Sequence, residues 1–359
     1  MIRIREGSSR LLRVLRKEGT PHRRPLPCLM HPRCGQNPEE MSGIPEDISK
    51  LYGSCTLCPR SCKADRNIRA GFCKAGVKPR LAKAMIHIWE EPVLCESGGS
   101  GAVFFSNCTL RCVYCQNYEI SAKGFGREIT PADLADIFLS LEQKGAQNID
   151  LITASHYLPS VLEALDMVRH KIKIPFVYNC GGYESVKSLR LLSGYIDIYL
   201  PDIKYYDDAP AVKYSFAPHY FETACEALEE MIRQTGAPVI EKAGGADAMK
   251  KGVIVRHMVL PSHKNDSLAV LENLYRIFGP DKFILSLLRQ YTPFYLAKTS
   301  PEFKEINRRV TGYEYDAAAD EAARLGFKGF IQEKSSAKEE YTPVFDLEGI
   351  PGGITIPAL

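Results

Sequence analysis

The amino-acid sequence predicts an α/β protein: a partial, TIM-like (β/α)6 barrel with a cysteine-rich metal module before it. Two observations lead to this fold class. Between residues 98 and 290, short apolar runs alternate with longer segments whose apolar residues recur at helical spacing, which is typical of a parallel sheet covered by helices. The alternation gives about six strand–helix units, fewer than the eight of a closed barrel. The 12 cysteines are grouped at short spacings, which in a chain of this size favours metal binding in a reducing compartment over disulfides.

The composition is that of an ordinary folded protein. The chain has 359 residues, of which 25% are charged and 45% hydrophobic, and its formal net charge is +3. A charge this small gives no argument for binding nucleic acid or an anionic membrane. No apolar run reaches the roughly 18 residues that a membrane helix needs. We therefore expect a cytoplasmic protein without nucleic-acid or membrane partners.

The sequence divides into four segments. We expect a basic, proline-rich arm over residues 1–46, the metal module over 47–97, the barrel over 98–290, and a helical extension with a tail over 291–359. The arm is rich in arginine but lacks the apolar run of a secretory signal. It is expected to be solvated and poorly ordered, with an organelle transit peptide as the alternative.

Four cysteines of the metal module have the spacing of metal ligands. Cys55-x2-Cys58 and the nearby Cys62 are followed by Cys73 after a glycine that allows a close turn. A Cys-x2-Cys loop points backbone amides at its sulfurs. Four thiolates suit either zinc or a second iron–sulfur cluster, and cysteines packed as small apolar side chains are a further alternative. We expect a structural site, because a closed metal site contributes directly to folding.

Three more cysteines follow the first apolar strand of the barrel, residues 102–105. Cys108, Cys112 and Cys115 lie on one short loop, with the aromatic Tyr114 before the last cysteine. Three thiolates bind three irons of a cubane cluster and leave the fourth iron open, and open positions on metals are where substrates bind. A structural zinc loop or buried cysteines are the alternatives.

The remaining barrel elements follow in order. Thr130 and Pro131 suit the start of a helix whose apolar stripe ends near Gly145. Further strands are predicted over residues 148–154, 174–179, 196–203, 253–260 and 283–288, and helices over 160–171, 185–192, 221–236, 266–279 and 316–325. Ligands bind at the carboxyl ends of parallel strands. The polar residues at these ends are Thr153, Ser155 and His156; Asn179, Gly181 and Gly182; Asp202 and Lys204; Arg256, His257 and His263; and Arg289, Gln290 and Tyr291.

From Cys55 to Gln332 the chain resembles the radical S-adenosylmethionine (SAM) proteins related to pyruvate formate-lyase activating enzyme, in particular a branch called PflX-like. Cys108-x3-Cys112-x-Tyr114-Cys115 is similar to the family signature Cys-x3-Cys-x-aromatic-Cys. Asp202-Ile203-Lys204 resembles the Asp-x-Lys strand that lies by SAM and the substrate glycine in the activating enzymes. Asn179-Cys180-Gly181-Gly182 looks like their Thr-Asn-Gly segment beside the SAM methionine.

The resemblance implies an oxidoreductase with a [4Fe–4S] cluster on the three loop cysteines and SAM on the open iron. Reductive cleavage of SAM would give a 5′-deoxyadenosyl radical that abstracts hydrogen from the substrate. Asp202 and Lys204 are the expected catalytic residues. The expected cofactor-binding residues are Cys108, Cys112, Cys115, Thr153, Ser155, Asn179, Gly181 and Gly182. The chain lacks the family's Gly-Gly-Glu after the second strand, and a hydroxyl of Thr153 or Ser155 would replace it at the SAM amino group.

The resemblance also implies partners. A glycyl-radical protein is the expected substrate, and a flavodoxin- or ferredoxin-type protein is the expected electron donor. Two other hypotheses stay open: a radical SAM enzyme that modifies a small molecule, peptide or nucleoside, and a non-catalytic metal-binding scaffold or nucleic-acid-binding zinc protein. The near-neutral charge disfavours the nucleic-acid-binding protein.

Overall fold

The structure is a computed structural model of the chain and describes residues 48–96, 98–243, 245–332 and 343–352. The arm predicted over residues 1–46 lies outside the described residues. Within them, no helix is long and apolar enough to cross a membrane.

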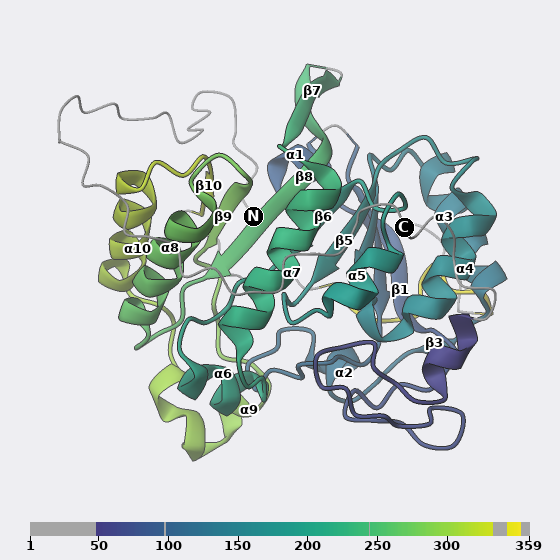
Figure 1. Cartoon of the computed structure of the whole chain (residues 1–359), viewed down its shortest axis with the longest axis horizontal. Coiled ribbons are helices and arrows are strands. Elements are labelled where there is room, and N and C mark those ends of the chain that lie inside the picture. The colour runs from purple at the N-terminus through teal and green to yellow at the C-terminus, as the bar shows by residue number, and fades with distance from the viewer. Residues whose placement is uncertain (1–47, 97, 244, 333–342, 353–359) are drawn as a thin grey trace, which may run out of the picture.

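A ten-stranded, mostly parallel sheet forms the centre of the molecule (Figure 1). Its strand order is β10-β9-β8-β6-β5-β4-β2-β1-β3, and β7 pairs with β8 alone. Strands β2, β4, β5, β6, β8, β9 and β10 run parallel, whereas β1 pairs antiparallel with both β2 and β3. The strands are β1 Arg80–His87, β2 Ser100–Phe105, β3 Arg127–Glu128, β4 Ile149–Ile152, β5 Phe176–Cys180, β6 Ile198–Pro201, β7 Val239–Ala243, β8 Ala246–Met258, β9 Ile284–Leu288 and β10 Gly329–Ile331.

The predicted α/β class is confirmed, with differences at the edges of the sheet. The six predicted strands are β2, β4, β5, β6, β8 and β9. The sheet continues beyond them through β10 on one side and the antiparallel β1 and β3 on the other. Strand β8 begins at Ala246 rather than at residue 253, because its first half forms a hairpin with β7. This hairpin projects from the top of the molecule in Figure 1.

Helices connect the parallel strands, as the alternating pattern predicts. In Figure 1 helices α10, α8, α7, α5 and α4 follow one another from left to right across the sheet. The helices are α1 Pro92–Cys95, α2 Tyr118–Ser121, α3 Pro131–Gln143, α4 Leu158–Val168, α5 Val186–Leu191, α6 Asp208–Ser215, α7 Tyr220–Thr235, α8 Lys264–Phe278, α9 Tyr295–Thr299 and α10 Gly312–Arg324, with 3-10 turns η1 Ile48–Tyr52, η2 Ser155–Tyr157 and η3 Pro301–Ile306.

Helix α3 shows how local sequence sets these elements. The Thr130 hydroxyl accepts the N–H of Asp133 at 3.1 Å, and the Asp133 carboxylate accepts the N–H of Thr130 at 2.9 Å. This reciprocal capping box satisfies two amides that the first helical turn leaves free. The predicted apolar stripe of α3 is buried, so the helix packs that face toward the sheet.

The cysteine-rich segment before β1 is irregular apart from η1 and packs against the helical side of the barrel. The Tyr52 hydroxyl lies 3.2 Å from the Ser160 hydroxyl of α4, and the Ser188 hydroxyl of α5 donates to the Leu57 carbonyl at 2.8 Å. Buried Arg66 donates to the carbonyls of Ala75, Gly76 and His156. The bonds of Tyr52, Leu57 and Arg66 therefore tie the segment to α4, to α5 and to the η2 turn after β4.

Candidate functional site

The polar residues at the strand ends meet in one cavity. It opens at the carboxyl edge of the parallel strands, where ligand sites form in such sheets. Its lining brings together most of the residues that the sequence singles out for cofactor binding and catalysis. These are Cys108, Cys112, Cys115, Thr153, Asn179, Gly181, Asp202 and Lys204, together with Arg256, Gln290 and Tyr291.

The loop between β2 and α2 presents the three thiols to this cavity. Asn107 and Arg111 adopt left-handed backbone angles, with φ of 72° and 56°, and so turn the chain tightly around the sulfurs. The Val113 N–H donates to the Tyr214 carbonyl at 2.8 Å, and the Ala297 N–H donates to the Val113 carbonyl at 2.9 Å. The loop is therefore held by α6 and α9 from two sides.

Each sulfur of the loop accepts a hydrogen bond. The Leu110 N–H donates to Cys108 Sγ at 3.3 Å, the Ser215 hydroxyl to Cys112 Sγ at 2.9 Å, and the Ser121 hydroxyl to Cys115 Sγ at 3.2 Å. Burial raises the pKa of the Cys108 thiol to about 11 and that of Cys115 to about 12. A bound metal would displace these protons and leave thiolates. The hydrogen bond that each sulfur already accepts would stabilise its negative charge. The residues therefore fit a [4Fe–4S] cluster.

A network of charged and amide side chains lies beside the cluster loop. Lys204 Nζ lies 2.5 Å from Asp202 Oδ2, and Arg256 Nε lies 2.8 Å from Asp202 Oδ1. Arg256 also donates to Asn179 Oδ1 at 2.5 Å, and Asn179 Nδ2 donates to Asp150 Oδ2 at 3.1 Å. Burial acts to raise the pKa of Asp202, but the charges of Arg256 and Lys204 outweigh it and hold this pKa below its usual range. Asp202 is thus an anion between two cations.

Three buried acids near Arg256 are not singled out by the sequence, and two of them, Glu90 and Glu91, line the same cavity. Glu90, Glu91 and Asp150 are buried near Arg256, and burial raises the pKa of Asp150 to about 7 and that of Glu90 well above its usual range. Within the described residues, Glu91 Oε2 and Asp150 Oδ1 have no hydrogen-bond partner. A signal was present for Asp150, which interrupts the apolar strand β4. Glu90 and Glu91 carry no such signal, because they follow the unpredicted β1.

The segment that replaces Gly-Gly-Glu places its two hydroxyl residues differently. Thr153 lines the cavity with a left-handed φ of 62°, and its N–H donates to the Asn179 carbonyl at 2.8 Å. Ser155 instead points away, and its hydroxyl donates to Glu184 Oε1 at 2.8 Å. Of the two predicted hydroxyls, the structure therefore brings only that of Thr153 to the cavity.

The two glycines after β5 have different surroundings. Gly181 lines the cavity, and a Cβ there would lie 2.6 Å from Leu110 Cδ1 of the cluster loop. Gly182 has φ of 78°, and its Cβ would lie 2.0 Å from the Asp202 carbonyl oxygen. Gly182 therefore lets the end of β5 cross closely over the residue that follows β6.

The second cysteine group lies in a separate, smaller cavity. Cys55, Cys58, Cys62 and Cys73 line it together with Phe72. Cys62 is exposed and the other three are buried, and burial raises the pKa of the Cys58 thiol to about 12. The structure thus brings all four predicted ligands of the metal module together.

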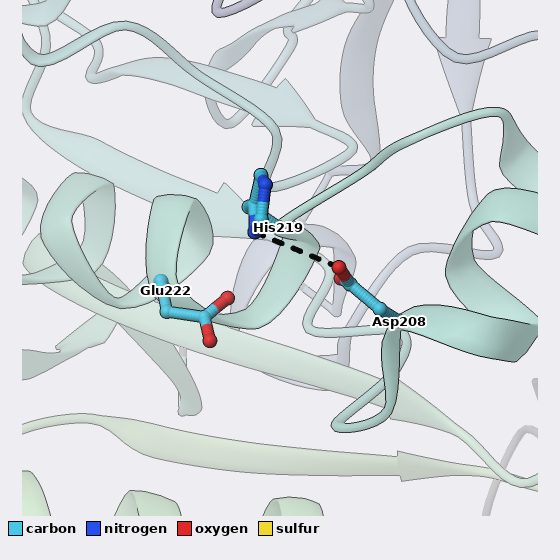
Figure 2. Close-up of side chains that lie close together, drawn as sticks. All are labelled: Asp208, His219 and Glu222. Atoms are coloured by element: carbon cyan, nitrogen blue, oxygen red, sulfur yellow. Dashed lines mark ion pairs between the residues drawn. The ribbon is translucent and has the colours of Figure 1, made fainter.

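One further cluster of ligand-type side chains lies at the surface. Asp208, His219 and Glu222, at the starts of α6 and α7, place ligand atoms within 4.8 Å of one another (Figure 2). All three are exposed, and Asp208 pairs with His219 Nδ1 at 3.6 Å while accepting the Tyr220 N–H at 3.3 Å. We interpret Asp208 and His219 as a surface pair at the start of a helix rather than as a metal site.

Comparison with known proteins gives a family match over the centre of the chain. The family model described as the Radical SAM superfamily matches residues 102–240, which include the cluster loop and strands β4 to β6. The uncharacterized protein MJ0674 of Methanocaldococcus jannaschii is 27% identical over 290 residues, covering 78% of this chain and 77% of that protein.

Comparison with solved structures gives three weak matches. A radical SAM methyltransferase from Sphaerobacter thermophilus is 12% identical with a TM-score of 0.45, covering 63% of each chain, which is under two thirds of that structure's length. Methylornithine synthase (PylB) is 10% identical with a TM-score of 0.44, covering 81% of this chain and 72% of the other. The FeFe-hydrogenase maturase HydG from Carboxydothermus hydrogenoformans is 15% identical with a TM-score of 0.38, covering 66% and 59%.

Proposed function

We propose that this protein binds a [4Fe–4S] cluster and SAM and cleaves SAM reductively to start hydrogen abstraction from a substrate, because the radical SAM superfamily model matches residues 102–240. The observation that carries the proposal is the shared cavity: the three thiols of the cluster loop and the Asp202–Lys204 pair line the same space. When bound, the cluster and SAM supply the one-electron chemistry.

The chain's own residues bind, orient and shield. Asn179 is fixed by Arg256 on one side and Asp150 on the other, so its amide is held rigidly at the cavity wall. Gly181 presents its backbone to the cavity, with no Cβ in the way. Asp202 and Lys204 supply one acceptor and one donor group for polar parts of SAM or the substrate. Their side chains are partly buried, with 21% and 16% exposed, and this strengthens such contacts because water screens them less.

We extend the proposal to the glycyl-radical-activating type, in which the substrate is a glycyl-radical protein and the electron donor is of the flavodoxin or ferredoxin type. The support is the Asp202-Ile203-Lys204 segment, which resembles the Asp-x-Lys strand of those enzymes. Both side chains lie at the cavity rather than against the helices.

A small cationic substrate is the second candidate, and the buried acids favour it. Four carboxyl groups, of Glu90, Glu91, Asp150 and Asp202, act on the single guanidinium of Arg256. Burial keeps protons on such groups by raising the pKa of Glu90 and Asp150. An ammonium group of a substrate would take the place of these protons, because a buried anion is stabilised by a paired cation.

The first experiment tests SAM cleavage itself. Cys112→Ala leaves only two thiols on the loop, whereas the cubane needs a thiolate on each of three irons. We therefore expect loss of the SAM-binding cluster and of 5′-deoxyadenosine formation. Anaerobic iron analysis and a SAM-cleavage assay would measure both. Cys225→Ser on α7 is the matched control and should keep both. Full SAM cleavage by the Cys112→Ala protein would refute the assignment.

The second experiment separates the two substrate classes. Wild-type enzyme is given SAM, a reductant and either a deuterated glycine-containing heptapeptide or deuterated 1,4-diaminobutane, and deuterium in 5′-deoxyadenosine is measured. Transfer from the peptide favours the glycyl-radical type. Transfer from the diamine that is lost in Glu91→Gln favours a cationic substrate, because the substitution removes a buried carboxyl group.

A further inference from the structure

We propose that Cys55, Cys58, Cys62 and Cys73 hold a second [4Fe–4S] cluster, which passes electrons to the cluster on Cys108, Cys112 and Cys115. The metal site stands on its own observations, whereas the relay rests on the proposed function above.

The cavity of the second group is built for sulfur ligands. All four thiols line it. The backbone N–H of Arg60 forms a hydrogen bond with the Cys58 sulfur, and that of Ala75 with the Cys73 sulfur. Each donor lies two residues after its cysteine, which is the arrangement of a metal-binding knuckle. A Cβ on Gly71 would lie 2.6 Å from Cys62 Sγ, so glycine at this position leaves room for the sulfur where it lies.

The spacing of the thiols favours a cluster over a single zinc ion. Zinc–sulfur bonds of about 2.3 Å in a tetrahedron place four sulfurs ~3.8 Å apart. Among the described residues, no three of these four thiols lie within 4.8 Å of one another. A cubane separates its thiolates more widely, because each binds a different iron. Among the described residues, the thiols of Cys108, Cys112 and Cys115 likewise do not all lie within 4.8 Å of one another.

The charges around the cavity suit an anionic cluster. Four thiolates make a cubane site negative, and a buried negative charge needs nearby cations. Arg60 interacts electrostatically with Cys58, and Arg66 with Cys73. Arg66 is buried beside the cavity. Both cations lie within the cysteine-rich segment itself, so the site carries its own compensation.

A short bridge of side chains joins this site to the first cluster loop. Arg60 interacts with both the Cys58 and the Cys108 thiols, and its Nε donates to the Thr109 carbonyl at 2.6 Å. The Phe72 ring contacts two guanidinium groups, with Arg60 Cζ at 3.6 Å and Arg111 Cζ at 4.3 Å from its centroid. Arg111 in turn donates to the Phe72 carbonyl at 3.3 Å. One arginine therefore spans the distance between the two cysteine groups.

The relay conserves electrons at each step. A reduced one-electron donor protein, of the iron–sulfur or flavin class, loses one electron to the second cluster, which passes from the 2+ to the 1+ state. The second cluster returns to 2+ as the first cluster becomes 1+. Cys62 is exposed, so the donor would approach at this cysteine, while the three buried thiols face inward.

Metal analysis tests the site without relying on activity. We expect anaerobically reconstituted wild type to hold about eight irons per chain, and the combined Cys108→Ala, Cys112→Ala, Cys115→Ala variant about four, with a cubane Mössbauer signature. Zinc in place of iron, or no metal in the triple variant alongside about four irons in wild type, would overturn the proposal. A triple variant that keeps its cluster while wild type fails to cleave SAM would refute the proposed function alone.

Electron transfer is tested on full-length Cys62→Ser, which changes the exposed ligand and spares the buried ones. With a reduced flavodoxin as donor, we expect the SAM-responsive paramagnetic resonance signal of the first cluster to appear at least about tenfold more slowly than in wild type. Reduction by dithionite, a small reductant, should stay within twofold or so of wild type. Cys225→Ser is the control. An unchanged rate with flavodoxin would overturn the relay.

Discussion

At the scale of single residues, the alternation of side chains along an extended chain predicts where the Asp202–Lys204 pair points, although β6 itself ends at Pro201, one residue before Asp202. Residues two apart on a strand point to the same face, and the apolar neighbours Leu200 and Ile203 are fully buried. A charged pair facing the helix layer would be costly to bury. The sequence therefore predicts that both side chains face the inside of the barrel, and both line the cavity.

Replacing either member of this pair should impair the site without destroying it. In Lys204→Met, Asp202 still pairs with Arg256 at 2.8 Å, so folding and the first cluster should survive. We expect Asp202→Asn and Lys204→Met to weaken SAM binding or turnover at least about tenfold, or ~1.4 kcal/mol. Isothermal titration and a SAM-cleavage assay measure this, with exposed Lys242→Met as control. Near-normal values in both variants would leave the pair a structural ion pair.

Other site residues could not be found from the sequence, for a physical reason. Arg256 stands out as a polar strand-end residue, but its contacts with Asp202 and Asn179 depend on the register of β8 beside β6. That register is a long-range property of the sheet. Glu90 and Glu91 reach Arg256 from the far end of β1, so local patterns indicate neither their burial nor their partner.

At the scale of elements, the sequence predicts the apolar, parallel strands of the sheet. It does not predict the strands that are polar or only two or three residues long. β5 and β9 are buried along their whole length. β7 contains exposed Glu241 and Lys242, and β3 and β10 have only two and three residues. β1 carries lysine and alanine, which occur less often in strands. β1 is therefore stabilised as a strand by its antiparallel pairing with β2 rather than by its composition.

The close crossing between the ends of β5 and β6 gives an element-scale prediction. In Gly182→Ala the new Cβ would lie 2.0 Å from the Asp202 carbonyl at φ of 78°, whereas in Gly194→Ala φ is 85° and nothing lies within 4 Å. We expect Gly194→Ala to cost about 1 kcal/mol from backbone strain alone. Gly182→Ala should cost clearly more and also lower SAM affinity, as thermal denaturation and titration would show. Equal effects of the two substitutions would mean that β5 and β6 can separate freely.

At the scale of the whole molecule, folding buries the carboxyl group of Glu184, which accepts hydrogen bonds from two neutral hydroxyl groups. Glu184 is 3% exposed, and its carboxyl group accepts hydrogen bonds from the Ser155 hydroxyl at 2.8 Å and the Tyr178 hydroxyl at 3.4 Å. Burial raises its pKa from 4.5 to about 7. The folded state therefore holds a proton that the unfolded state releases at lower pH. This group's contribution to stability is complete below pH 4.5 and is lost as the pH rises through about 7.

Glu184→Gln should remove this pH dependence. Glutamine keeps the acceptor oxygen for Ser155 but cannot ionise, so between pH 5 and pH 8 the variant should gain stability relative to wild type, by at least about 1 kcal/mol. Anaerobic thermal denaturation of the full-length holoprotein at both pH values measures the difference in Tm. Glu222→Gln, which changes an exposed carboxylate, is the control and should show no such trend. A Glu184→Gln difference that stays constant across this range would mean that the folded protein already holds Glu184 as an anion. The hydrogen bonds of Ser155 and Tyr178 would then outweigh the cost of burial.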